Sequence, residues 1–321
     1  MRSIRLHQFG APDVLVAQET PMPKPAADEV LVRMEAAGIN YLDVYQRSGA
    51  YPVSLPFTPG QEAAGTVTEV GSAVRLVAPG DRVAWLLVPG AYAEYSIVPE
   101  GRLVPVSPHL SMRVAAAILF QGVTAWEWTT AVYPIRAGQH VLVHAAGTGV
   151  GRLLVQMSRA QGAHVLGTAD DARKLAAAEA AGAEVTALTQ ATNLSKAVRE
   201  WTDGRGVDVV YDGVGGPTWD MSLSAVTLRG TVVSFGQAGG PLPNVDISTL
   251  GQRGSLTVIR PVLAHYLDPE ELRAAACAVF DGVMAGTWEP VVDKIYSLDR
   301  ASDAHRRLES GDARGKLLLV P

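Results

Sequence analysis

The chain has 321 residues, a formal net charge of −5 and 48% hydrophobic residues, enough apolar material to fill the cores of two domains. The negative balance and the lack of lysine and arginine clusters exclude a general affinity for nucleic acid, and no apolar run reaches the roughly 18 residues of a membrane-spanning helix. We therefore expect a two-domain cytoplasmic protein, and we expect its single cysteine, Cys277, to pack in the core of a helix.

Short alternating segments, broken by proline and glycine, make up the first third of the chain. Alternation of apolar and polar residues predicts strands that bury one face. We expect such strands at 29–34, 65–70, 81–85 and 93–98. Together they predict a barrel-like antiparallel domain.

A glycine-rich turn follows an apolar segment in the middle of the chain. Residues 141–143 predict a buried parallel strand, and the spacing of Val150, Leu153 and Met157 predicts a helix that packs on it. The turn between them therefore lies at a helix N-terminus, where backbone N–H groups and the helix dipole favour a phosphate.

The turn matches the dinucleotide fingerprint G-x-G-x-x-G only at its last glycine, because Ala146 and Thr148 stand at the first two positions and Gly151 at the third. By itself it could be an ordinary strand-to-helix turn. A second strand at 164–168 and a second helix at 171–181 complete a β-α-β unit around it, which favours dinucleotide binding.

Strands and helices go on alternating, which predicts a doubly wound α/β domain with a parallel sheet. The expected elements are a helix at 194–201, a strand at 207–211, a helix near Trp219, and strands at 231–235 and 255–259. The tail predicts helices at 269–285 and 302–308 and a strand at 317–320. Because these have no sheet of their own, we expect the tail to return to the first domain. The expected divisions are 1–116, 117–261 and 262–321.

Seven segments then follow one another in a recognisable order: 38–49 (GINYLDVYQRSG), 58–65 (TPGQEAAG), 79–83 (PGDRV), 144–147 (HAAG), 209–215 (VVYDGVG), 233–236 (VSFG) and 259–261 (IRP). In this order they resemble the zinc-independent, zeta-crystallin-like quinone oxidoreductases of the medium-chain dehydrogenase/reductase superfamily. The resemblance implies a GroES-like catalytic domain, a partly open β-barrel, into which a Rossmann domain is inserted. It also implies a cofactor between the two domains and NADPH-dependent reduction of quinones or related conjugated carbonyls.

The chain departs from the zinc-dependent members of that superfamily at the metal site. The three positions that match their zinc ligands hold Asn40, Gln61 and Phe120, and neither an amide nor a phenyl ring replaces an imidazole, thiolate or carboxylate. Glu62 alone cannot hold the metal. We therefore expect no metal, and we expect hydrogen-bond donors to polarise the carbonyl.

Three donors follow from the resemblance as candidate catalytic residues. Asn40 offers amide N–H groups, and the phenols of Tyr45 and Tyr51 stay protonated at neutral pH. From the residues alone, Asn40 could be a turn residue and the tyrosines could simply pack as a wall. We assign no dedicated general acid, and bulk water could supply the final proton.

Charge near the end of the second strand indicates which nicotinamide cofactor is used. The position at which NAD-specific domains carry an acid for the ribose is Ala169, and Lys174 with its neighbour Arg173 stands where the family holds a 2′-phosphate. Asp170 and Asp171 bring opposing charge, although one of them would serve as the helix N-cap. We expect NADPH in preference to NADH.

The remaining expected cofactor contacts lie in the glycine turn and at strand ends. The resemblance implies the following set: Thr124, Ala146, Gly147, Thr148, Gly149, Val150, Gly151, Thr168, Asp212, Gly213, Val214, Phe235, Gly236, Arg260 and Lys316. Arg260 and Lys316 are expected to close over the cofactor, with exposed surface cations as the alternative. Thr148 would either crowd the pyrophosphate or give it a further hydrogen bond.

The expected function is therefore NADPH-dependent, zinc-free hydride transfer to a quinone or a related conjugated carbonyl. Reduction of the C=C bond of an enal, enone or enoyl thioester would use the same geometry. A cofactor-binding protein with a structural, sensing or RNA-interacting role is the alternative from another class. The last strand, 255–259, would leave an apolar sheet edge, so we expect a homodimer that pairs through it.

Overall fold

The computed structural model describes residues 1–190 and 194–321, and it divides into two compact units. Unit 1 comprises Met1–Val123 and Leu267–Pro321, and unit 2 comprises Thr124–Tyr266. The first division falls inside helix α2 (Met112–Glu127). None of the helices in the described ranges is long and apolar enough to cross a membrane.

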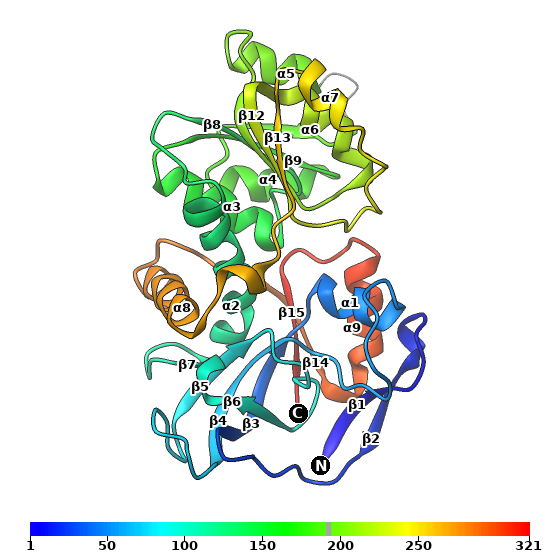
Figure 1. Ribbon diagram of the computed structural model, residues 1–321, viewed down its shortest axis with the longest axis vertical. Helices are drawn as coiled ribbons and strands as arrows, with labels where there is room; N and C mark the ends of the chain where they lie inside the picture. Colours follow the sequence, from blue (N-terminus) through cyan, green and yellow to red (C-terminus); the bar gives the residue numbers. More distant parts are fainter. Residues whose placement is uncertain (191–193) are drawn as a thin grey trace. The chain divides into compact units, whose positions relative to one another are not determined.

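Unit 1 is built on a mostly antiparallel sheet in the order β14-β15-β3-β4-β5-β7, with β6 also paired to β3 (Figure 1). Its strands are β3 (Glu29–Gly38), β4 (Glu62–Val70), β5 (Arg82–Leu86), β6 (Tyr95–Pro99), β7 (Leu103–Pro105), β14 (Val292–Ser297) and β15 (Lys316–Val320), beside a separate pair β1 (Arg2–Leu6) and β2 (Leu15–Glu19). The helices that accompany them are α1 (Tyr41–Ser48), α2, α8 (Pro269–Met284) and α9 (Ala301–Glu309).

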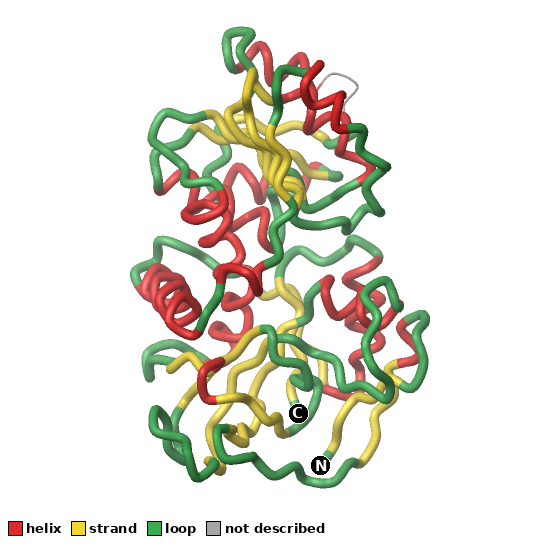
Figure 2. Tube along the Cα trace, in the orientation of Figure 1, coloured by secondary structure: helices red, strands yellow, loops and turns green. Residues whose placement is uncertain are grey.

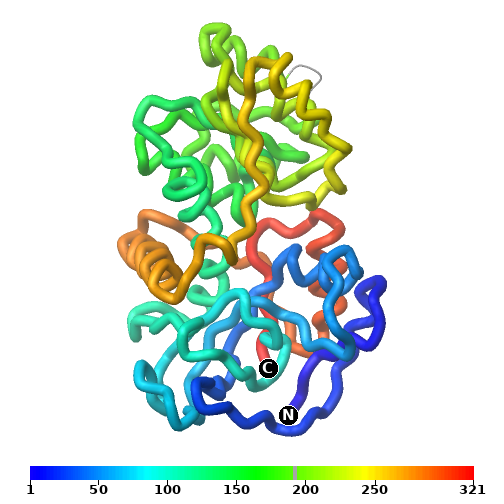
Figure 3. The backbone as a smooth tube through the Cα atoms, viewed as in Figure 1, coloured from blue at the N-terminus to red at the C-terminus, as the bar shows by residue number. Residues whose placement is uncertain are grey.

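The C-terminal segment completes the sheet of unit 1, as the sequence predicts. Leu318 and Leu319 of β15 pair antiparallel with Gly38 and Ala37 of β3, so the two ends of the chain share one core. Figure 3 shows the red C-terminal strand among the blue and cyan strands. The pairing brings residue 316 next to residues near position 40, which are 276 positions away in the sequence.

Unit 2 is a parallel six-stranded sheet in the order β10-β9-β8-β11-β12-β13, with helices beside it (Figure 2). Its strands are β8 (His140–Val143), β9 (His164–Ala169), β10 (Val185–Leu188), β11 (Val207–Asp212), β12 (Val226–Ser234) and β13 (Thr257–Ile259). Its helices are α3 (Gly149–Ala160), α4 (Ala172–Ala180), α5 (Leu194–Trp201), α6 (Trp219–Ala225) and α7 (Ile247–Gln252). Strand order reverses between β8 and β11, the place where doubly wound sheets bind nucleotides.

Two expectations from the sequence need correction. Cys277 is exposed and does not pack in a helix core, because α8 buries another face that includes Leu272, Ala276 and Phe280. The edge strand is also shorter than 255–259, since Ser255 has a φ of 55° and the strand begins only at Thr257.

Candidate functional site

The N-cap of helix α1 in unit 1 is Asn40, a residue that the sequence predicts to be catalytic. The Asp43 carboxylate accepts the backbone N–H of Asn40 at 2.8 Å, which satisfies an amide at the start of the helix. The helix ends at Gly49, whose φ of 84° suits glycine. The first turn of α1 therefore fixes the backbone of Asn40.

The Asn40 side chain lies in a buried polar cluster. Its Nδ2 donates to Glu62 Oε1 at 2.9 Å, and its Oδ1 accepts from Lys316 Nζ at 2.7 Å. Lys316 also forms an ion pair with Glu62, and the backbone N–H of Phe120 donates to Glu62 Oε2 at 2.7 Å. Asn40, Glu62 and Lys316 are 8%, 0% and 2% exposed. Within the described residues Nδ2 makes only this one bond, so its second N–H is available.

For Lys316 the structure excludes the exposed surface cation that the sequence left open as an alternative. Its ammonium is buried in unit 1 and paired with Glu62 and Asn40, so it is neither a surface charge nor a free cation. Burial of a lysine requires such partners, because an unpaired charge in a protein core is costly.

The other two candidate catalytic residues lie close to each other at the far end of α1. The rings of Tyr45 and Tyr51 are 5.1 Å apart between centroids, and the backbone N–H of Tyr51 donates to the carbonyl of Tyr45 at 3.0 Å. Tyr41, which the sequence analysis does not single out, adds a third ring 6.1 Å from Tyr45. Tyr51 is 41% exposed, so its phenol can reach a ligand.

The three positions that correspond to zinc ligands in other members of the superfamily converge around Glu62. Asn40 and the backbone of Phe120 both bind its carboxylate, and Gln61 precedes it in the chain. The Gln61 side chain donates to Gln46 at 2.9 Å. In the described part of the chain, no three His, Cys, Asp or Glu side chains are grouped in a way that could hold a metal ion.

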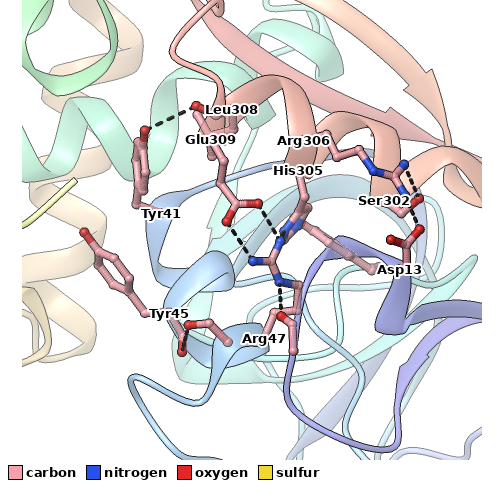
Figure 4. Close-up of polar contacts among 12 residues, drawn as sticks. Asp13, Tyr41, Tyr45, Arg47, Ser302, His305, Arg306, Leu308 and Glu309 are labelled. Atoms are coloured by element: carbon pink, nitrogen blue, oxygen red, sulfur yellow. Dashed lines mark hydrogen bonds and ion pairs between the residues drawn. The ribbon is translucent and has the colours of Figure 1, made fainter. Parts of the chain in front are cut away.

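A second buried network in unit 1 escapes the sequence analysis. The Tyr92 hydroxyl donates to Asp43 at 3.2 Å and lies 3.0 Å from His305 Nε2, and Arg47 lies 3.5 Å from His305 Nδ1. Arg47 also binds Glu309 through both terminal nitrogens, at 2.6 and 2.7 Å (Figure 4). The network ties α1 to α9 and ends at the carboxylate that holds Asn40.

Burial shifts the titration of these groups. It raises the pKa of Asp43 to about 7, and it raises that of Tyr92 well above its ordinary value. It lowers the pKa of His305 to about 3, helped by the charge of Arg47. At neutral pH the imidazole and the phenol are therefore uncharged. Of this network, only Asp43 could have been noticed in the sequence, because it lies three residues after Asn40 at the start of a helix. No motif surrounds Tyr92 or His305.

The glycine turn of unit 2 has little room for side chains. A Cβ at Gly147 would come within 2.1 Å of the Lys174 carbonyl oxygen, and one at Gly151 within 2.2 Å of the Ala145 carbonyl oxygen. Gly149 has a φ of 53°, and Thr148 is the extended N-cap of α3 without a side-chain capping bond. The turn, which also includes Ala146 and Val150, therefore packs closely against neighbouring backbone. It does so at the N-terminus of the twelve-residue helix α3.

The charged residues after β9 have separate tasks. Asp171 is the N-cap of α4 and accepts the backbone N–H of Lys174 at 2.9 Å. Asp170 forms an ion pair with Lys174 Nζ at 2.8 Å, and Arg173 follows Asp171 in the first turn of α4. The predicted capping role of one aspartate is therefore confirmed, and the other neutralises the cation predicted to read a phosphate.

Asp212, a predicted strand-end contact, uses its side chain inside unit 2. The buried Asp212 carboxylate accepts the N–H groups of Val214 and Gly215 and the hydroxyls of Thr218 and Ser222. It therefore shapes the loop after β11, where Gly213 also lies.

The buried hydroxyl of Thr168 lies 2.8 Å from His144 Nδ1. Burial lowers the pKa of His144, which keeps its imidazole neutral. This pair joins the ends of β8 and β9, so the Thr168 side chain is used within the sheet.

The last predicted contacts lie after β12 and at the start of unit 2. Arg260 donates to the carbonyl oxygens of Ser234 and Gly236 at 2.9 and 2.8 Å, so it fastens the loop that carries Phe235. Thr124 is 5% exposed in α2.

Comparisons with known proteins give the family. Residues 26–108 match the family model described as alcohol dehydrogenase GroES-like domain, and residues 149–279 match the one described as zinc-binding dehydrogenase. A probable quinone oxidoreductase of Schizosaccharomyces pombe is 38% identical over 99% of this chain and 96% of its own length. A 2-haloacrylate reductase of a Burkholderia species is 34% identical over 98% of both chains.

A solved structure agrees with these matches. The crystal structure of Escherichia coli quinone oxidoreductase complexed with NADPH superposes with a TM-score of 0.97, at 38% identity and with both chains fully covered. Likeness of this extent covers both units and not merely the dinucleotide-binding fold. The chain belongs to the quinone oxidoreductase family of the medium-chain dehydrogenase/reductase superfamily.

Proposed function

We propose that this chain transfers hydride from NADPH to a quinone or a related conjugated carbonyl. The observation that carries the proposal is the full-length likeness to a quinone oxidoreductase solved with NADPH. When bound, NADPH supplies the hydride. The residues of the chain hold both reactants and stabilise the charge that develops on the acceptor oxygen.

In this proposal the glycine turn and the strand ends of unit 2 hold the dinucleotide. The N-terminus of α3 would offer backbone N–H groups to the pyrophosphate, and the bare Gly147 and Gly151 let the turn pack closely against the carbonyl oxygens of Lys174 and Ala145. Lys174 and Arg173 would bind the 2′-phosphate, with Lys174 exchanging Asp170 for it. Thr124 and the loops at Asp212–Val214 and Phe235–Gly236 would complete the site.

The catalytic part of the proposal lies in unit 1. The available N–H of Asn40 and the phenols of Tyr45 and Tyr51 would donate hydrogen bonds to the acceptor oxygen. No zinc takes part, although one matching family model is described as zinc-binding, because Asn40, Gln61 and Phe120 are poor ligands. Elemental analysis and activity in a chelator test this; one zinc per chain, lost together with activity, would contradict it.

A second candidate is reduction of an activated C=C bond. The 2-haloacrylate reductase among the relatives favours it, since a haloacrylate carries a C=C bond conjugated to a carboxylate. A hydrogen-bonded carboxylate or carbonyl oxygen would gain charge in the same place. The third possibility, a cofactor-binding protein with little turnover, predicts that NADPH binds and no acceptor is reduced.

One experiment separates these functions. NADPH oxidation is followed at saturating cofactor with a panel of quinones, enals, enones and 2-haloacrylate. Turnover with quinones supports the first function, and preference for the others supports the second. Binding of NADPH, measured by fluorescence, without turnover of any acceptor would contradict both.

Assembly and location complete the proposal. We propose a homodimer that pairs through β13, an edge strand of the six-stranded sheet, because its Val258 and Ile259 are only partly buried. The cytoplasm is the proposed location, as expected from the sequence.

A further inference from the structure

The partners of Asn40 determine which end of its amide faces which way. Amide oxygen and nitrogen are hard to distinguish by shape, but their partners settle the assignment here. An ammonium such as that of Lys316 can only donate hydrogen bonds, and an ionised carboxylate such as that of Glu62 can only accept them. Asn40 Oδ1 must therefore face Lys316 at 2.7 Å, and Nδ2 must face Glu62 at 2.9 Å.

The surroundings keep this ion pair in place. The backbone N–H of Phe120 holds the second oxygen of Glu62 at 2.7 Å, so the carboxylate has partners on both sides. Gly38 leaves the space that the pair occupies, since a Cβ there would lie 2.2 Å from Glu62 Oε1 and 2.6 Å from Lys316 Cε. Glu62 and Lys316 are both buried, so neither can move into solvent to relieve a change.

We propose that Glu62 and Lys316 are positioning residues that fix the polarity of the Asn40 amide, so that its remaining N–H donates to the acceptor oxygen. The catalytic consequence rests on the proposed function. Hydride brings two electrons to the acceptor and leaves a negative charge on its oxygen until a proton arrives from water. An amide turned by half a revolution would present its oxygen there and would repel that charge.

The main variant is Lys316→Met, which keeps the side chain out to the position of Cε and removes the donor to Asn40 Oδ1. The amide can then rotate, so we expect enone turnover to fall about 10- to 100-fold, as for a misplaced catalytic group. Quinone turnover should fall much less, because a strongly oxidising quinone needs little polarisation. The dissociation constant for NADPH, measured by fluorescence, should stay the same.

Two further variants guard against misfolding, since Lys316→Met leaves Glu62 without its cation. The double variant Glu62→Gln/Lys316→Met removes both charges together. Gly38→Ala keeps both charges and pushes them apart. Both should lower enone turnover relative to quinone turnover in the same way.

Asp293→Asn is the matched control. Asp293 lies on β14, the neighbour of the strand that carries Lys316, and binds Arg307 at 2.7 and 3.2 Å. Its side chain is 10% exposed, and it does not contact Asn40. Loss of this ion pair should leave the ratio of enone to quinone turnover unchanged.

A direct measurement separates this inference from the proposed function. The chain has three asparagines, so selective 15N-asparagine labelling gives few side-chain signals. In the wild type, one Asn40 N–H proton should exchange slowly, because Glu62 holds it, and Lys316→Met should change both the shift and the exchange. Wild-type protein that reduces no acceptor would defeat the proposed function, while the spectrum still decides the orientation.

Other outcomes overturn the inference. An unchanged Asn40 signal in Lys316→Met would show that the pair does not orient the amide. Equal loss of enone and quinone turnover would assign the pair to the fold alone. Weaker NADPH binding with an unchanged ratio would make Lys316 a cofactor contact, as the sequence analysis expects.

Discussion

The polar side chains of the site in unit 1 fall into two groups. Some can donate a hydrogen bond to an acceptor, and the others hold the donors in position. Asn40 has one N–H left over from its buried bonds, and Tyr51 is 41% exposed. Glu62, Asp43 and Lys316 are buried and bind the chain itself. Mutations of the first group should therefore affect chemistry more than stability.

Asn40→Ala and Tyr51→Phe test this division. Each removes a donor, and the loss of the main one should raise the barrier by about 3 kcal/mol, which lowers turnover about 100-fold. NADPH binding should change little, and an enone should suffer more than a quinone. Steady-state kinetics with both acceptors measure the effect. If turnover survives in both variants and in Tyr45→Phe while NADPH binding weakens, these residues only shape the binding site.

Cofactor choice depends on another pair of side chains. Lys174→Ala should raise the Michaelis constant for NADPH and leave that for NADH nearly unchanged, because NADH has no 2′-phosphate. Asp170→Asn should lower the Michaelis constant for NADPH. The 2′-phosphate then no longer competes with the carboxylate that lies 2.8 Å from Lys174. Equal effects on both cofactors, measured from initial rates, would remove Lys174 from the phosphate site.

Among the elements, β13 is the strand through which we propose that two copies pair. It is an edge strand of the sheet in unit 2, and its backbone groups on one side have no strand to pair with in the described chain. A second copy could extend the sheet there by an isologous contact. The other edge strand, β10, provides the comparison.

Light scattering at micromolar concentration should give twice the 33.9 kDa mass of one chain. Val258→Lys should reduce the measured mass to that of one chain, because a charge on an edge strand opposes pairing. Leu188→Lys on β10, where Leu188 is 43% exposed, is the control and should leave the dimer intact. A wild-type monomer, or dissociation by the control alone, would contradict pairing through β13.

At the scale of the whole molecule, the sequence predicts what is local and misses what is distant. Helical spacing after residues 141–143 was enough to predict the Rossmann unit, since strand, turn and helix are contiguous. The bond between Lys316 and Asn40 was not predicted, because it spans 276 positions. Tyr92 and His305 lie 213 positions apart, and neither has a motif around it. Both contacts depend on β15 and α9, which lie in unit 1 although they are far along the chain. They could therefore not be predicted from neighbouring residues.

That return also buries two titrating groups whose effects on stability have opposite signs. The folded pKa of Asp43, about 7, lies above its ordinary value of 3.8, so its contribution is complete below pH 4 and is lost as the pH rises to 7. The folded pKa of His305, about 3, lies below its ordinary 6.5, so its contribution is complete above pH 6.5 and is lost as the pH falls to 3. Between pH 4 and 6.5 the two slopes cancel.

Removing one group should expose the slope of the other. Relative to the wild type, the free energy of unfolding of Asp43→Asn should fall by about 1.4 kcal/mol for each unit of acidification between pH 6.5 and 4, because only His305 then resists protonation. For His305→Gln it should rise by a similar amount over the same window. Urea unfolding at several pH values measures both, and Asp293→Asn should run parallel to the wild type. Parallel curves for all variants would mean that neither Asp43 nor His305 changes its protonation on folding.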